Sequence, residues 1–375
     1  MRQIFMVAVL ASQLAFAATP TLTLEQKLYD YLRSTQILEH SDVRFVGLWP
    51  NTVQAVGDSR VFSETDIFTG LHTMLMLDEI DKKQALVGYK QVQQTFQEAF
   101  EAYRSDSAQS AGTLNFWPLR AGSFHHFSTD PQIISVTGIP DLPNDFDDSA
   151  LGFLWQMAQG QAPAEELLPV LGQYHDQRSG AFFTWFIPRE SNTDCVVNLN
   201  ILHALAQFES LGGHLPVETA AAKKSALRYI RQVIESKKTT TCASFYDRSS
   251  QFFVALARVY DAKNDSIDFV PLSTEALLSH AKLALSSKNG TELAEYIIAL
   301  KLFSKAERSP TFASLIADLT QNLQSTIHQT TDLAFLDSDS VFLGESQQGE
   351  WAGKKQQWFS PAQSTATALL ALTLP

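Results

Sequence analysis

Residues 194–209 read DCVVNLNILHALAQFE, and this stretch decides the fold class of the chain. After an acidic start almost every position is apolar or small, so a helix over this range has apolar side chains around most of its circumference. A helix of that kind is stable when other elements enclose it on all sides. The stretch therefore predicts a fully buried helix inside a larger helical assembly.

Five further segments share this composition and begin with polar or acidic residues. Together with 194–209, we expect inner helices at 64–77, 147–159, 248–261, 291–304 and 361–374. Between them lie amphipathic segments with one charged face, which is typical of helices that cover a core from outside. These outer segments are residues 24–38, 83–103, 164–175, 217–235, 274–285 and 310–329.

Outer and inner segments alternate from end to end in units of about 45–80 residues, which indicates a helical array. Because every unit contains a buried helix, we expect closure into a ring rather than an open superhelix, and no sheet of more than three strands. The predicted fold class is all-α, an (α/α)6 toroid of six outer and six inner helices. The longest links precede residues 64, 147 and 361. We therefore expect long loops at the end of the ring where the inner helices begin, and we place the site at this mouth.

Residues 1–17 have the pattern of a signal peptide. Arg2 precedes an apolar run of about a dozen residues, and Ala15-Phe16-Ala17 matches the small-x-small site of a signal peptidase. The run is shorter than the roughly 20 residues that a stable transmembrane helix needs, although an uncleaved anchor is the alternative. We expect a periplasmic or secreted protein with one toroid domain over residues 18–375 and no stable membrane insertion after signal cleavage.

The balance of charges limits the partners. The chain has 28 basic and 40 acidic residues, so its formal net charge is −12. An acidic protein of this kind is a poor partner for nucleic acid, which leaves a small-molecule or polymer ligand. No nucleotide-binding or metalloprotease motif is present, and His125-His126 lacks acids at ligand spacing, so we expect neither a cofactor nor a metal.

The sequence contains two cysteines, Cys195 and Cys242. Export to an oxidising compartment would permit a disulfide between them, whereas two separate buried thiols are the alternative. Because both precede or open neighbouring inner helices, we expect them to approach each other near the mouth.

Residues at the mouth form two groups of binding candidates. Aromatic residues in the long links could line a pocket or stack on sugar rings, or they could only anchor the loops. Acids and amides at the starts of inner helices could bind a ligand, or they could only cap the helices and tie them together. The candidate substrate-binding residues are Asp66, Trp117, Trp185, Asp194, Asn198, Tyr246, Asp247 and Trp358.

Residues 144–148, NDFDD, contain more carboxylates than capping requires. Three like charges that are partly buried together cannot all ionise cheaply, so at least one should stay protonated near neutral pH. A protonated carboxyl in an apolar pocket is a general acid. Asp145, Asp147 and Asp148 are therefore the candidate catalytic residues.

The run Asp145-Phe146-Asp147-Asp148-Ser149-Ala150 resembles the DxDD(T/S)A motif of class II terpenoid cyclases, which belong with the protein prenyltransferases to the α/α-toroid superfamily. In that family the middle acid protonates an alkene or epoxide, a role that the resemblance gives to Asp147. Gln348-Gly349-Glu350-Trp351 resembles the tail of the family's structural glutamine–tryptophan repeat. The resemblance implies an exported isomerase or lyase that cyclises or isomerises an apolar isoprenoid.

Two other functions remain open at this stage. The family's cyclases normally enclose their substrate between two helical domains, whereas this sequence has room for one. Helical toroids also serve saccharide-active hydrolases and lyases, which use paired carboxylates. A non-catalytic ligand-binding protein could use the same pocket.

Overall fold

The computed structural model describes residues 22–106, 112–117, 119–120, 124–125, 144–163, 165–186, 193–246, 248–262, 270–306, 310–330, 341–345, 350–352 and 354–375. The expected signal peptide, residues 1–17, lies outside the described residues. None of the helices in the described ranges is long and apolar enough to cross a membrane.

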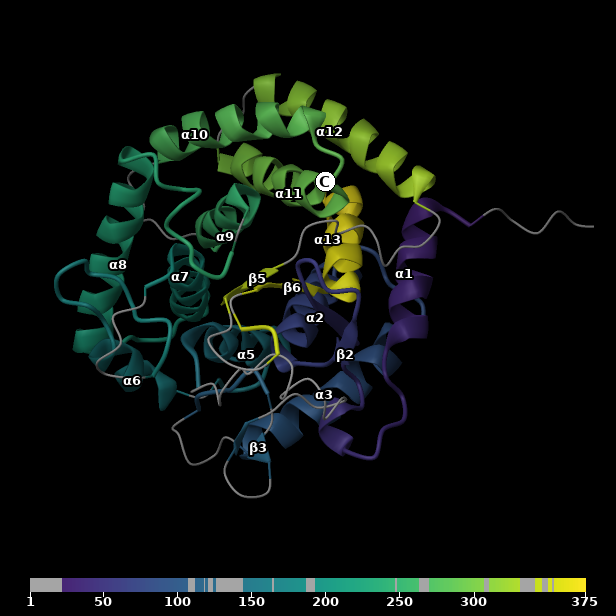
Figure 1. The fold of residues 1–375 in the computed structure, drawn as a ribbon. Coiled ribbons are helices and arrows are strands. Elements are labelled where there is room, and N and C mark those ends of the chain that lie inside the picture. The colour runs from purple at the N-terminus through teal and green to yellow at the C-terminus, as the bar shows by residue number, and fades with distance from the viewer. Residues whose placement is uncertain are drawn as a thin grey trace, which may run out of the picture.

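Six helices form the inner ring. They are α2 (Ile67–Asp81), α5 (Phe146–Ala158), α7 (Cys195–Ser210), α9 (Ser249–Asp261), α11 (Gly290–Ala306) and α13 (Pro361–Thr373). Each packs against the next one along the chain, and α13 packs back onto α2, so the ring is closed (Figure 1). The expectation of closure over an open superhelix agrees with this arrangement.

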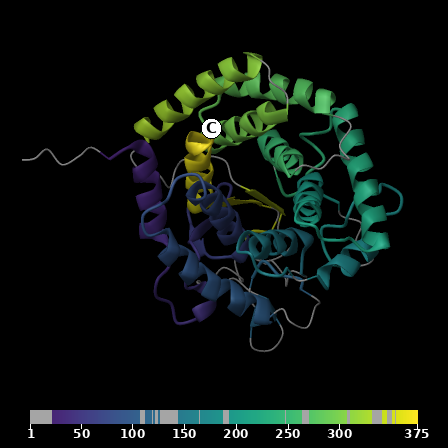
Figure 2. The same cartoon turned by 180° about the vertical axis from the view of Figure 1, so that it is seen from behind.

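The other helices of the described residues lie outside this ring, as both views show (Figures 1 and 2). They are α1 (Leu24–Thr35), α3 (Tyr89–Asp106), α6 (Leu167–Gln173), α8 (Val217–Glu235), α10 (Val270–Leu283) and α12 (Pro310–Gln329). On α8, Ala226 and Ile230 are buried while Lys224 and Arg228 are exposed, as the amphipathic pattern predicts. The alternation of outer and inner helices therefore follows the sequence pattern.

The long links are not only loops, and the expectation that no sheet exceeds three strands was wrong. Strands β1 (Asn51–Ala55), β2 (Phe62–Glu64), β5 (Val341–Glu345) and β6 (Lys355–Phe359) form an antiparallel sheet in the order β2-β1-β6-β5. A second pair joins β3 (Leu119–Arg120) to β4 (Phe124–His125). In both views β5 and β6 lie within the outline of the ring (Figures 1 and 2). Because β1 pairs with β6, the first long link is tied to the last.

The four-stranded sheet has a small hydrophobic core of its own, separate from the main core between the two rings. Its buried members are Val53, Ala55, Phe62, Trp117, Trp351 and Trp358. Trp117 also donates a hydrogen bond from Nε1 to Glu64 Oε1 at 2.6 Å. Large aromatic side chains in the long links thus join these links to the sheet.

Candidate active site

Asp147 lies where three elements of the ring meet. Its neighbour Asp145 caps α5, because Asp145 Oδ1 accepts from the Asp148 backbone N–H at 2.7 Å. Asp147 is therefore not needed as the cap. Its Oδ1 accepts from Asn200 Nδ2 of α7 at 2.8 Å, and its Oδ2 accepts from the hydroxyl of Tyr246, just before α9. Both carboxyl oxygens are held by side chains from neighbouring inner-ring units.

The two partners of Asp147 open onto a cavity inside the ring. Asn200 and Tyr246 line this mouth-side cavity of about 430 Å³, and its wall is completed by α2, α9, α11 and α13. The lining residues that the sequence analysis missed include His72, Gln251, Arg258, Glu295, Gln363 and Thr367. A rear cavity of about 610 Å³ lies on the other side of Arg258, which borders both.

The lining residues also give the direction of the inner helices. Val196 and Gln251, in the first turns of α7 and α9, line the mouth-side cavity. Glu79, Gln207 and Asp261, near the ends of α2, α7 and α9, line the rear cavity. The helices therefore run in the same direction, and the mouth is at their N-terminal end.

The carboxyls at the start of α5 hold protons near neutral pH. Burial raises the pKa of Asp147 to about 7, even though hydrogen bonds from Tyr246 and Asn200 favour its ionised form. Burial, with the charge of Asp147 beside it, raises the pKa of Asp145 to about 8. Burial and the neighbouring charge of Asp145 also raise the pKa of Asp148 well above its usual range. The crowding argument made from the sequence therefore applies to Asp145 and Asp148, whereas burial is the main cause of the raised pKa of Asp147.

The raised pKa values predict that the free energy of unfolding falls as the pH rises from about 6.5 to about 8. In this window the unfolded chain has already released the protons of its carboxyls, whose pKa is near 3.9, whereas Asp145 and Asp147 still hold theirs when folded. The folded state therefore binds more protons, and its advantage is lost as the pH passes through the folded pKa values. Urea unfolding at several pH values measures this slope.

Two histidines with lowered pKa values affect the pH dependence of stability in a different pH range from the carboxyls. Burial lowers the pKa of His72 and of His203 to about 3, so these residues contribute a slope of the opposite sign, but only below about pH 6.5. Asp147→Asn should reduce the fall in stability above that pH. An unfolding free energy that rises between pH 6.5 and 8 would contradict the protonated cluster.

The acidic and amide candidates away from α5 have structural partners. Asp66 caps α2 through its bond from Thr69 N, 2.7 Å, and Asp194 caps α7 through its bond from Val196 N, also 2.7 Å. The side chain of Asn198 exchanges two hydrogen bonds with the backbone of Phe182, at 2.7 and 3.0 Å. None of Asp66, Asp194 and Asn198 lines either cavity. These contacts are those of helix caps and of a polar network, and the assignment of the three residues to substrate binding stays a prediction.

Among the described aromatic candidates, Tyr246 is the one that borders a cavity. Trp117 and Trp358 belong to the core of the sheet, and their assignment to substrate binding stays a prediction. Trp185 is half-buried and packs edge-on against Phe245, with ring centroids 5.7 Å apart. Asp247 lies outside the described residues. No cluster of His, Cys, Asp and Glu suited to a metal occurs in the described part of the chain.

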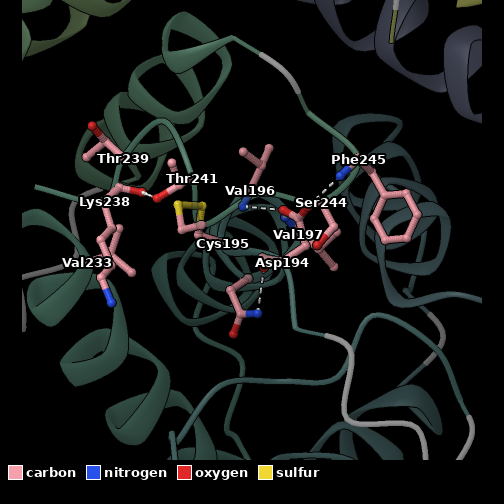
Figure 3. Close-up of a disulfide and its surroundings, with 12 residues drawn as sticks. Asp194, Cys195, Val196, Val197, Val233, Lys238, Thr239, Thr241, Ser244 and Phe245 are labelled. Carbon is pink, nitrogen blue, oxygen red and sulfur yellow. Dashed lines mark hydrogen bonds between the residues drawn. A yellow bond between two sulfur atoms is a disulfide. The ribbon is translucent and has the colours of Figure 1, made fainter. Parts of the chain in front are cut away.

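Cys195 and Cys242 form a disulfide at the mouth end of α7, with their Cα atoms 5.5 Å apart (Figure 3). The expected approach of the two cysteines is confirmed. Next to the disulfide, the second carboxyl oxygen of Asp194 accepts from the backbone N–H groups of Ser244 and Phe245, at 2.6 and 3.0 Å (Figure 3). The segment that leads to Tyr246 is therefore fixed to the start of α7 at two points.

Known proteins provide a match in fold but not in sequence. No protein-family model and no curated protein matches the chain. The fold is similar to that of ent-copalyl diphosphate synthase from Streptomyces platensis, with a TM-score of 0.54 and 13% sequence identity over 82% of this chain and 50% of that chain. It is also similar to a protein from Actinoplanes, with a TM-score of 0.56 and 12% identity over 93% and 97% of the two chains.

These similarities concern the architecture. The helical ring is similar to the toroid of a class II terpenoid cyclase, as the resemblance of residues 145–150 implies. This chain spans half the length of the synthase.

Proposed function

We propose that this protein is an acid-initiated cyclase or isomerase of an unsaturated isoprenoid, with Asp147 as the general acid. The observation that carries the proposal is the position of Asp147: it is buried behind the wall of the mouth-side cavity, its pKa is raised to about 7, and the two residues that bond to it, unlike Asp147 itself, line that cavity. The similarity in fold to a class II cyclase supports the same chemistry.

The arrangement supports a simple proton transfer. The carboxyl O–H of Asp147 protonates an alkene or epoxide, which leaves a carbocation on the substrate and a carboxylate on the protein. Asn200 and Tyr246 donate to that carboxylate and so stabilise the charge that develops on it. The cation is discharged when a neighbouring C–H bond of the substrate breaks and its proton is released. Return of a proton to Asp147 restores the acid.

A saccharide-active enzyme is less well supported by the cavity. Glycoside hydrolysis requires two carboxyl groups that flank the scissile bond, and sugars commonly stack on aromatic side chains. Within the described residues, Glu295 is the one carboxyl on the wall of the mouth-side cavity, Asp147 lies behind that wall, and Tyr246 is its one Phe, Tyr or Trp.

We also propose that the enzyme works outside the cytoplasm. The Cys195–Cys242 disulfide supports this location, because structural disulfides persist in oxidising compartments and are rare in the cytosol. The sequence pattern of residues 1–17 points to the same compartment.

The test is incubation of the purified protein in D2O with linear isoprenoids, both with and without a terminal acidic group, followed by mass spectrometry. Asp147 exchanges its proton with the solvent, so the initiating step should place deuterium on a carbon atom of the product. Consumption of no isoprenoid, together with release of reducing ends from polysaccharides, would instead support the saccharide-active alternative. Binding without any conversion would support the non-catalytic one.

A further inference from the structure

Arg258 is a half-buried cation between the two cavities of the ring. It lies on α9 and borders both the mouth-side and the rear cavity. Within the described part of the chain, its guanidinium makes no ion pair and no hydrogen bond. Because a charge that is partly withdrawn from water costs free energy when it has no partner, an arginine in this position requires an explanation.

The acids near Arg258 are engaged elsewhere. Glu295 accepts from Ser250 Oγ at 2.6 Å and from Arg248 at 3.4 Å. Glu79 pairs with Lys83 at 2.7 Å, and Asp261 pairs with Lys305 at 2.7 Å. Each carboxylate on the walls of the two cavities thus has a cation other than Arg258 as its close partner.

His72 is a second polar group without a partner. It comes from α2, lines the mouth-side cavity and is 6% exposed, and neither of its ring nitrogens has a hydrogen-bond partner. Burial lowers the pKa of His72 and of His203 on α7, and the positive charge of Arg258 lowers both further. The three side chains therefore interact electrostatically across the ring. A neutral imidazole can donate one N–H bond and accept another.

We propose that Arg258 and His72 form a binding site for a carboxylate, and that the ligand of the mouth-side cavity is an unsaturated, mainly apolar carboxylic acid. Two carboxylate oxygens match the fork of a guanidinium, and an imidazole N–H supplies a further donor. The choice of an unsaturated acid as the ligand rests on the proposed function, in which Asp147 protonates the apolar part of the same molecule.

The charge in the cavity favours a monoanion. Arg258 supplies one positive charge, and the negative charge of Glu295 on the same wall is paired with Arg248. His72 is neutral because burial lowers its pKa to about 3. A carboxylate balances that charge. A diphosphate would leave further negative charge buried and uncompensated, at a cost in free energy.

Calorimetric titration with three ligands of equal chain length tests the site: octanoate, octyl phosphate and 1-octanol. Since a hydrogen-bonded charge contributes about 1.5–3 kcal/mol, octanoate should bind at least tenfold more tightly than 1-octanol. Arg258→Gln should abolish this preference. Arg231→Gln removes an exposed arginine of α8 that pairs with Glu235, and should keep the preference. His72→Phe keeps a ring of similar size. It should weaken the binding of octanoate and leave the binding of 1-octanol unchanged.

Several outcomes would overturn the proposal. Equal affinities for octanoate and 1-octanol in the wild type, or an unchanged preference in Arg258→Gln, would show that no carboxylate is bound there. Tighter binding of octyl phosphate than of octanoate would contradict the choice of a carboxylate. If Arg258→Gln does not fold, the result for His72→Phe decides, because retention of full octanoate affinity in that variant contradicts the site.

The proposal can fail independently of the catalytic one. Asp147→Asn should retain the preference for octanoate even though it lacks the acid. A retained preference with no turnover of any isoprenoid acid by the wild type would leave the anion site standing and refute the general acid. If Arg258→Gln converts neutral isoprenoids at the wild-type rate and neither protein binds an acid, the anion site is refuted and the general acid remains supported.

Discussion

Asp147→Asn is expected to lower turnover by about a thousandfold or more while the protein remains folded. The amide has nearly the size of the carboxyl but cannot supply the proton that starts the reaction. Because burial raises the pKa of Asp147, a neutral side chain at this position should not reduce stability near neutral pH. Deuterium incorporation in D2O and thermal melting, measured on the same preparation, give the two results.

Asp66→Asn is the matched control for this variant. Asp66 is also a buried carboxyl at the start of an inner helix, and its pKa is likewise raised by burial, to about 6. Its hydrogen-bond partners Asn51 and Thr69 border neither cavity, whereas both partners of Asp147 line the mouth-side one. Asn caps a helix about as well as Asp, so we expect turnover to be retained. Equal losses in the two variants would mean that Asp147 acts through the fold. Full turnover in Asp147→Asn would exclude it as the acid.

The double ring was predictable from the sequence because its determinants are local. A segment such as 194–209, apolar around its circumference, can be stable only when it is enclosed. The sheet had no such local signal. Its strands are three to five residues long, and Val53 pairs with Trp358 from the other end of the chain. Alternation with period two cannot be recognised in segments so short.

The site could be predicted only in part. Three carboxyls within four residues exceed what one helix cap requires, and this excess pointed to the cluster at residues 145–148, in which the resemblance to the cyclase motif selected Asp147. A single acid at a helix start, such as Asp66 or Asp194, looks the same in sequence whether it caps or binds. Arg258 and His72 interrupt apolar inner segments, but which side of each helix faces the cavity is fixed only when the ring closes.

Loss of the Cys195–Cys242 disulfide is expected to lower the free energy of unfolding by about 4 kcal/mol at most. The two residues are 47 positions apart, and the entropy of closing a loop of that length in the unfolded chain gives this figure. Denaturant unfolding of Cys195→Ser/Cys242→Ser against the wild type measures the difference. Wild-type protein in reductant should match the double variant, and the double variant should not respond to reductant.

Loss of the disulfide should lower turnover only in part, although it lowers the free energy of unfolding measurably. The disulfide holds the segment that carries Tyr246, and Tyr246 donates to Asp147, so a looser segment should weaken the alignment of the acid. Asp194 still holds that segment through Ser244 and Phe245, which should preserve part of the activity in the folded fraction. Turnover is therefore measured well below the unfolding midpoint. Wild-type stability of the double variant would contradict the stabilising role of the disulfide. A folded variant without any turnover would contradict the role of Asp194 in holding the segment.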